Sequence, residues 1–155
     1  MNGLAQQLGT IDAVVAKKAD AAWCAGLLTI VCIGETVAQR KDGEALSICA
    51  NQITAGGPHG MVLAANAIAY EPLWAIGTGD MPTDQQSTVM HAHIHQCRQR
   101  RLGAEGTAVH ILYGGSVKPS NAQEILALPA VGGALVGGAS PKARDFERIV
   151  NAVST

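Results

Sequence analysis

Glu71 is the first residue of this sequence whose type and position suggest chemistry. It ends an apolar run, Ala67–Glu71, that is typical of a buried strand, and Pro72 follows it directly. Burial disfavours the charged form of a carboxylate, so a partly desolvated Glu at a strand end can act as a general base. The alternative is a Glu that pairs with a Lys or Arg, because structural ion pairs also perturb carboxylates. Taken alone, Glu71 favours that structural alternative.

The segment after Glu71 is a loop with an apolar tip. Pro72–Pro82 places Trp74 and Ile76 between a proline and two glycines. An apolar loop with a stiff start and permissive glycines suits a lid that closes over a site and excludes water. A loop that simply packs against a neighbour is the alternative. A dinucleotide-binding fingerprint is a weaker third choice, because proline stands where its third glycine would be.

Two glycine pairs, in Gly114–Ser116 and Gly137–Ser140, each follow an expected strand, and we expect each to open a helix. Glycines let the backbone approach an anion, and the amides at a helix start point toward it with a favourable dipole. A tight turn is the usual explanation of one such pair. Two pairs at successive strand ends are more specific and predict a phosphate site, which eight-stranded α/β barrels often place after their last two strands.

The histidines do not predict a metal site. His91, His93 and His95 are close in sequence, but only His91 and His95 share a helix face, and no Cys or carboxylate nearby completes a tetrahedral set. A solvated helix face is the preferred interpretation. His59 lies in a Gly-rich turn and His110 in a strand, and we expect none of the five to be catalytic.

The order of expected elements is one helix followed by four strand–helix units. Thr83 with Gln86, and Ser120 with Gln123, form capping-box patterns that predict helix starts, and Pro141 suits the first turn of a last helix. The strands are expected at 29–34, 67–71, 109–113 and 134–136, and the helices at 11–24, at 44–53, from 83, near 120–123 and from about 141 to 153. This alternation predicts an α/β fold with a parallel sheet, and the candidate residues all fall just after strands, where such folds place their chemistry.

Composition narrows the function classes. A net charge of -1 argues against nucleic acid or membrane attraction, and an aromatic share of 3% is too small for base-stacking platforms. Charged residues are only 15% of the 155, below the usual quarter, so part of the surface is expected to meet a partner. The four cysteines lack C-x-x-C spacing, and no leader or membrane span is apparent, which predicts a cytoplasmic protein with reduced thiols.

Four segments resemble signature segments of the triosephosphate isomerase family, in that family's order and approximate spacing. They are Ile30–Thr36 (IVCIGET), Ala69–Gly79 (AYEPLWAIGTG), Ile111–Asn121 (ILYGGSVKPSN) and Gly133–Ser140 (GALVGGAS). The resemblance runs from about residue 10 to the end. It therefore implies an unmatched tail, 1–9, and a single partial barrel domain, 10–155.

The resemblance implies a role for each matched residue. Glu71 matches the general base that moves the carbon-bound proton of the substrate, and Cys32 matches a thiol beside it. Glu35 matches a carboxylate that contacts the lid tryptophan, and Tyr113 matches a residue that, with Ser116, holds the closed lid. The matched positions of the substrate phosphate site are Gly77, Ser116, Gly137 and Gly138, and those of the lid are Pro72, Trp74, Ala75, Ile76, Thr78 and Gly79.

The departures from the family are large. Its strand-one Asn and Lys and its strand-four electrophilic His have no counterpart here, and a full barrel needs about 250 residues. We therefore expect the C-terminal four βα units plus a preceding helix of a (β/α)8 barrel. Asp80 stands where the family often has a basic residue, and Pro141 where it often has Leu.

The resemblance implies an aldose–ketose isomerase of glycolysis and gluconeogenesis that interconverts dihydroxyacetone phosphate and glyceraldehyde 3-phosphate without metal or organic cofactor. A fragment lacking the electrophile is expected to be inactive alone, and to form a homo-oligomer or to need a complementary N-terminal half. The alternative is a non-enzymatic phosphate-binding module or an inert truncated product that self-associates. No nucleic acid or membrane partner is expected.

Overall fold

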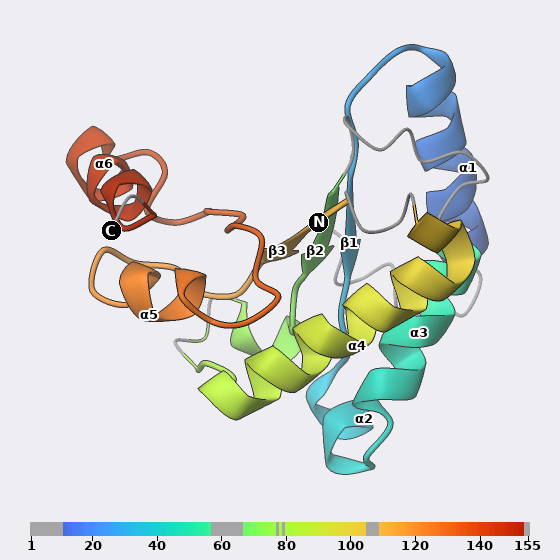
Figure 1. The fold of residues 1–155 in the computed structure, drawn as a ribbon, viewed down its shortest axis with the longest axis horizontal. Helices are drawn as coiled ribbons and strands as arrows, with labels where there is room; N and C mark the ends of the chain where they lie inside the picture. Colours follow the sequence, from blue (N-terminus) through green and yellow to red (C-terminus); the bar gives the residue numbers. More distant parts are fainter. Residues whose placement is uncertain (1–10, 57–66, 77, 79, 105–108, 154–155) are drawn as a thin grey trace.

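Three short parallel strands form the centre of the molecule. In a computed structural model, which describes residues 11–56, 67–76, 78, 80–104 and 109–153, they are β1 (Ile30–Ile33), β2 (Ala67–Tyr70) and β3 (His110–Tyr113), in the order β1-β2-β3 (Figure 1). The register places Ile33 beside Tyr70 and Tyr70 beside Tyr113. All three strands are the apolar runs predicted from sequence, and their carboxyl ends therefore finish side by side.

The predicted fourth strand is present only as a short pairing along β3. Tyr113 and Ala134 form a single parallel bridge. Three backbone hydrogen bonds support it: Gly132 N–H donates to Ile111 O (2.8 Å), Tyr113 N–H to Gly133 O (2.9 Å), and Leu135 N–H to Tyr113 O (2.9 Å). Glycine pairs lie on both sides of this pairing, and glycine weakens a strand. The segment nevertheless brings residues 135–139 beside the end of β3.

Helices cover the strands in two groups. Figure 1 shows α1 (Ile11–Cys24), α3 (Ala45–Gly56) and α4 (Asp84–Leu102) together on one side of the strands, with the short α2 (Val37–Lys41) next to them. The core between these helices and the sheet consists of Ala19, Val31, Ile33, Cys49, Ile53, Ile68, Tyr70, Met90, Ile94, Val109 and Ile111. Two more helices, α5 (Ala122–Leu126) and α6 (Ala143–Asn151), enclose a second core of Tyr113, Val117, Ala122, Ile125 and Ile149.

Of the three helix-start signals predicted from sequence, one is correct and two are wrong. Thr83 and Gln86 form the predicted capping box at α4. Ser120 does not cap α5, which begins after Asn121 and has no side-chain cap. Pro141 lies before α6, whose N-cap is Lys142, and not in its first turn. In both wrong cases the helix begins two residues after the expected start signal, at Ala122 and at Ala143.

His91 corrects the interpretation of the histidine cluster as a solvated face. His91 belongs to α4, and its side chain is fully buried. Its ring stands perpendicular to that of Tyr70, with centroids 5.9 Å apart, and is nearly parallel to that of Tyr113 at 6.3 Å. Burial lowers the pKa of His91 to about 4, and the Ala130 backbone opposes this shift only in part. The neutral imidazole is thus an aromatic member of the core.

We expect stability to fall as the pH drops from about 6.5 to about 4. His91 titrates near 6.5 in an unfolded chain and near 4 in the folded one, so between these values the unfolded state binds an additional proton and is favoured. A pKa difference of this size corresponds to about 3 kcal/mol. Urea unfolding at a series of pH values measures the slope.

The matched variants for this experiment are His91→Phe and His95→Gln. His91→Phe keeps an aromatic ring between the two tyrosines and removes the titrating group, so its acid slope should flatten. His95→Gln, on the same helix but only half-buried, should keep the slope of the unmodified chain. An unchanged slope in His91→Phe would show that another group causes the acid sensitivity.

Candidate active site

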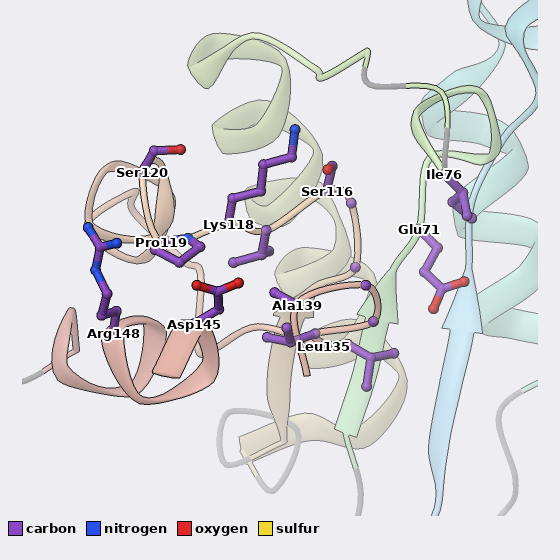
Figure 2. A pocket seen from close by; sticks show the side chains of 16 residues that line it. Glu71, Ile76, Ser116, Lys118, Pro119, Ser120, Leu135, Ala139, Asp145 and Arg148 are labelled. Atoms are coloured by element: carbon purple, nitrogen blue, oxygen red, sulfur yellow. The ribbon is translucent and has the colours of Figure 1, made fainter. Parts of the chain in front are cut away.

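A pocket of about 810 Å³ opens where the strands end (Figure 2). Three segments line most of it: the first residues after β2, the loop after β3, and the segment after the bridge at Ala134. Figure 2 shows Glu71 and Ile76 on one side of the pocket and Lys118, Ser120 and Arg148 on the other. The full lining is Glu71, Ile76, residues 114–120, residues 135–139, Asp145 and Arg148. One concave site thus collects Glu71, Ser116, Gly137 and Gly138 from separate parts of the chain.

Glu71 stands directly after β2, where two neighbouring strands hold it. Its N–H donates to Ile33 O at 2.7 Å, and the N–H of Gly114 donates to Tyr70 O at 2.7 Å. A Cβ at Gly114 would lie 2.4 Å from the Glu71 Cγ, so only glycine leaves room for this side chain. In the described part of the chain the one ion pair joins Arg40 and Glu35. The Glu71 carboxylate is therefore not tied to a Lys or Arg there, which weighs against its structural alternative.

Cys32 lies beside the Glu71 carboxylate. Burial, followed by the negative charge of Glu71 and a hydrogen bond to it, raises the pKa of this thiol to about 12. A thiol with such a pKa stays protonated near neutral pH, so it has no nucleophilic character there. Cys32 can only pack against the carboxylate and donate to it.

Glu35 is a fully buried carboxylate that joins β1 to the start of the lid. Its Oε1 accepts three hydrogen bonds, from Arg40 Nε (2.7 Å), Trp74 Nε1 (3.0 Å) and the Tyr70 hydroxyl (3.1 Å). The Arg40 guanidinium also lies over the Trp74 ring, 5.3 Å from its centroid, in a cation–π contact. Burial and then the charge of Glu35 raise the pKa of Tyr70, so its hydroxyl remains a donor. The predicted contact between Glu35 and Trp74 is therefore present.

The segment predicted to form the lid begins with a single turn. Leu73–Ala75 form a single 3-10 turn (η2), Pro72 and Ala75 are buried, and Leu73 N–H donates to Glu35 O at 3.1 Å. Ile76 follows at the pocket rim with 45% of its surface exposed. Further along, the hydroxyl of Thr78 donates a hydrogen bond to Trp74 O at 2.9 Å. Gly77 and Gly79, which were assigned to the phosphate site and to the lid, lie outside the described residues.

The two glycine pairs line the pocket, but neither opens a helix as predicted. Helix α5 begins only at Ala122 and α6 only at Ala143, so turns follow both pairs. Ser140 closes the second turn, since its N–H and its hydroxyl both donate to Gly137 O, at 2.9 and 2.7 Å. A Cβ placed on Gly137 or Gly138 would meet no atom within 4 Å. Their backbone therefore faces open space, and a bound anion would meet turn amides instead of a helix terminus.

The Tyr113 ring lies against the loop that follows β3. It is 1% exposed, and in the described part of the chain its hydroxyl has no hydrogen-bond partner. A Cβ on Gly115 would come within 2.5 Å of that hydroxyl, so glycine is needed where the loop crosses the ring. Ser116, the next residue, lines the pocket and is half-buried.

Asn121 is a positioning residue that sequence reasoning missed. Its side chain accepts from Lys118 N–H at 2.7 Å and donates to Ser116 O at 3.0 Å. The same amide lies 3.3 Å from the sulfur of Met81, at the far end of the lid. Asn121 thus braces the loop that carries Ser116. It belongs to the quoted segment ILYGGSVKPSN, and Asn side chains can bond backbone groups three or four residues earlier, which was the available signal.

Lys118, Arg40 and Arg148 were also not singled out from sequence. Lys118 and Arg148 bring two positive charges to the pocket, and its lining also includes the carboxylate of Asp145. No group of three or more His, Cys, Asp or Glu side chains suited to a metal occurs among the residues that the structure describes. His59 lies outside them. None of the helices searched is long and apolar enough to cross a membrane.

Comparison with known proteins identifies the family. The model of the triosephosphate isomerase family matches residues 5–153 of this chain. The chain belongs to the triosephosphate isomerase family. Triosephosphate isomerases of Rhodopseudomonas palustris and Acidiphilium cryptum are 53% and 51% identical to it over 138 and 150 residues. These matches cover 89% and 92% of this chain but 54% and 59% of the relatives, so the chain spans little more than half of their length.

A solved structure gives the same result. The crystal structure of triosephosphate isomerase from Bartonella henselae superposes with a TM-score of 0.87 at 41% identity, covering 95% of this chain and 59% of that one. The α/β class, with a parallel sheet and flanking helices, is thereby confirmed. The resemblance of the four signature segments to triosephosphate isomerase is confirmed as well.

We expect Glu35→Gln to destabilise the chain and to release Trp74. The neutral amide cannot form the ion pair with Arg40. Its NH2 group would also face the donors of Arg40, Tyr70 and Trp74, which now point at the carboxylate. Breaking a buried pair costs about 3–5 kcal/mol, and because the Arg40 side chain is 20% exposed we expect about 2–4 kcal/mol. Urea unfolding and the Trp74 indole N–H signal in NMR spectra measure both effects.

The control is Glu44→Gln, which makes the same chemical change at an exposed position before α3. It should alter the free energy of unfolding by less than about 0.5 kcal/mol. Equal effects of Glu35→Gln and Glu44→Gln would contradict the central role of the Glu35 carboxylate.

Proposed function

We propose that this chain supplies the base, lid and phosphate site of the triosephosphate isomerase reaction. That reaction interconverts dihydroxyacetone phosphate and glyceraldehyde 3-phosphate, in glycolysis and gluconeogenesis. The observation that carries the proposal is the single pocket lined by Glu71, Ile76, Ser116, Gly137 and Gly138. A carboxylate that forms no ion pair with the described residues, at one side of a concave site with backbone amides at the other, suits proton transfer on a small phosphorylated substrate.

Each residue has a role in this proposal. Glu71 takes the proton from one substrate carbon and returns it to the next. The amides at Gly77, Gly137 and Gly138, with Ser116, hold the phosphate dianion. Pro72, Trp74, Ala75, Ile76, Thr78 and Gly79 form the lid that excludes water. The buried Tyr113 hydroxyl, which has no partner in the described part of the chain, is available with Ser116 to receive the lid when it closes. No metal or organic cofactor is required.

The proposal covers only part of a barrel. We infer that residues 10–155 represent the C-terminal four βα units, with a preceding helix, of a (β/α)8 domain. The matched share of the relatives supports this inference. The family's Asn, Lys and electrophilic His have no matched position among these 155 residues. A cytoplasmic location is part of the same proposal, because it rests on the family.

The 155-residue chain alone should show at most about 10⁻³ of the isomerase activity of a whole enzyme. Loss of one donor at a developing oxyanion commonly costs about 10²–10³ in rate, and more than one is unmatched here. A coupled assay should be run on the chain alone and on the chain mixed with the N-terminal half of a relative. We expect activity to appear only in the mixture.

Glu71→Gln in that mixture should abolish the activity, whereas Glu147→Gln, an exposed carboxylate on α6, should leave it unchanged. Full turnover by the chain alone would contradict the expected inactivity. Activity of the mixture that survives Glu71→Gln would exclude Glu71 as the base.

A non-enzymatic phosphate-binding module is the second candidate. The glycine backbone facing open space, together with Lys118 and Arg148 in the same pocket, favours it, since these groups need no other part of a barrel. We expect phosphate or sulfate to shift the amide signals of Ser116, Gly137 and Gly138 together in an NMR titration, with weak affinity. The amides of Gly43 and Gly103, both exposed and outside the pocket, serve as controls. If they move as much as the pocket amides, binding is nonspecific.

Partnership with a second copy or with a complementary half is also proposed. In the described part of the chain β1 pairs with β2 alone, and Leu27, Leu28 and Ile30 at its start are 60%, 76% and 48% exposed. An apolar sheet edge is a template for pairing with another strand. We expect the chain to self-associate in sedimentation velocity runs over a concentration series.

Ile30→Lys should reduce this association, because a charge at a sheet edge opposes pairing. Val89→Lys introduces the same charge at a position on α4 of nearly equal exposure, 49%, and should have no such effect. A chain that remains monomeric at all concentrations would contradict the proposal.

A further inference from the structure

Gln52 on α3 hydrogen-bonds to the backbone at the end of β1 as a neighbouring strand would. Its Oε1 accepts from Gly34 N–H at 2.8 Å, and its Nε2 donates to Gly34 O at 3.0 Å. The side chain is 8% exposed and both hydrogen bonds are buried. A primary amide can satisfy a peptide N–H and C=O at once, because its oxygen accepts while its NH2 group donates.

The alternation of a parallel strand explains why this amide is needed. The carbonyls of Thr29, Ile33 and Glu35 accept from Ala67, Glu71 and Leu73, so the odd-numbered residues of this segment face β2. Gly34 consequently directs its N–H and C=O toward the opposite edge. Along that edge the described residues hold no strand, and Gln52 fills the place that a strand would take.

Gly34, directly after β1, also lies close against the Glu71 main chain. A Cβ on Gly34 would lie 1.8 Å from the Glu71 carbonyl oxygen and 2.6 Å from its carbon. These are backbone atoms, which cannot yield as a flexible side chain would. The position of Gly34 therefore determines the position of the Glu71 main chain.

The residue after Gly34 determines the start of the lid. The Glu35 carboxylate accepts a hydrogen bond from Trp74 Nε1, and the Glu35 carbonyl accepts one from Leu73 N–H. A shift of Gly34 would move Glu71 on one side and the anchor of Trp74 on the other. Among the described residues, the Gln52 side chain hydrogen-bonds to Gly34 and to neither of these two, and Gly34 is the residue on which both depend.

We propose that Gln52 is a positioning residue, which aligns Glu71 and the lid anchor Trp74 with each other by fixing Gly34. The functional meaning of this positioning rests on the proposed function of Glu71 and the lid. The alignment itself does not, because it concerns atoms of this chain in the absence of any substrate.

The test uses NMR spectra of the whole 155-residue chain. In Gln52→Leu, which has a similar shape and no polar atoms, amide exchange at Gly34 should accelerate by about tenfold or more. The signals of the Glu71 amide, the Leu73 amide and the Trp74 indole N–H should shift, whereas the Trp23 indole on α1 should not. The control Ile53→Val alters the next residue of the same helix, which is buried in the core, and should destabilise the chain without these local shifts.

Gln52→Glu keeps the proposal testable if Gln52→Leu does not fold. Its ionised carboxylate can accept from Gly34 N–H but repels Gly34 O. A protonated carboxyl can donate and accept, and burial raises the pKa of the introduced group into an accessible range. Lowering the pH to about 5 should restore the signals of Glu71 and Trp74 toward those of the unmodified chain at the same pH.

Two results would overturn the proposal. The first is unchanged signals of Glu71 and Trp74 in both Gln52 variants. The second is evidence of a structural role only. That would be either a Gln52 variant that disturbs the Trp23 signal and the whole core as much as it disturbs Glu71 and Trp74, or the same local shifts in Ile53→Val. Failure of the isomerase assay or of the phosphate titration would leave these spectra unaffected, so the proposed function and the role of Gln52 fail separately.

Discussion

The close approach of three strand ends around Glu71 is the constraint on which the site depends. Gly34 contacts the Glu71 main chain from β1, and Gly114 contacts its side chain from the end of β3. Hydrogen bonds of 2.7 Å from Glu71 to Ile33 and from Gly114 to Tyr70 fix both approaches. Any Cβ at either glycine would occupy the volume of Glu71. The carboxylate therefore has a defined place because its neighbours lack side chains, since among the described residues no Lys or Arg forms an ion pair with it.

Glu35 extends the same constraint to the lid. Burying a carboxylate is costly unless hydrogen bonds and a counter-charge compensate for it. Here Arg40, Tyr70 and Trp74 all donate to one oxygen, and the thiol of Cys49 lies 3.9 Å from the other. Because Glu35 directly follows Gly34, the proposed base and the first turn of the proposed lid are both positioned by the two residues that follow β1. Pro72 and Ala75 in this turn are buried, and Ile76, the next residue, is exposed at the pocket rim.

The sequence predicted the strands and the pocket residues better than it predicted how the helices meet them. Apolar runs located β1, β2 and β3, and the Thr83 capping box located α4, because these signals are local. His91 was assigned to a solvated face since its polarity is visible in sequence, whereas its two tyrosine neighbours come from different strands. Gln52 gave no signal at all, because its partner lies 18 residues away and presents only backbone atoms. The glycine pairs predicted an anion site for a partly wrong reason, since turns follow them and not helices.

The groups of the proposed site differ in what they require from other parts of a barrel. The amides at Gly137 and Gly138 are shaped by the turn that Ser140 closes, and the Ser116 loop is braced by Asn121 within the same 155 residues. The place of Glu71 is limited by Gly34 and Gly114, which directly follow β1 and β3. The family's electrophilic His, in contrast, has no matched position among these 155 residues. In the proposed reaction, substrate anchoring and proton abstraction therefore come from neighbouring strand ends of the described sheet, whereas polarisation of the substrate carbonyl needs a group from outside them.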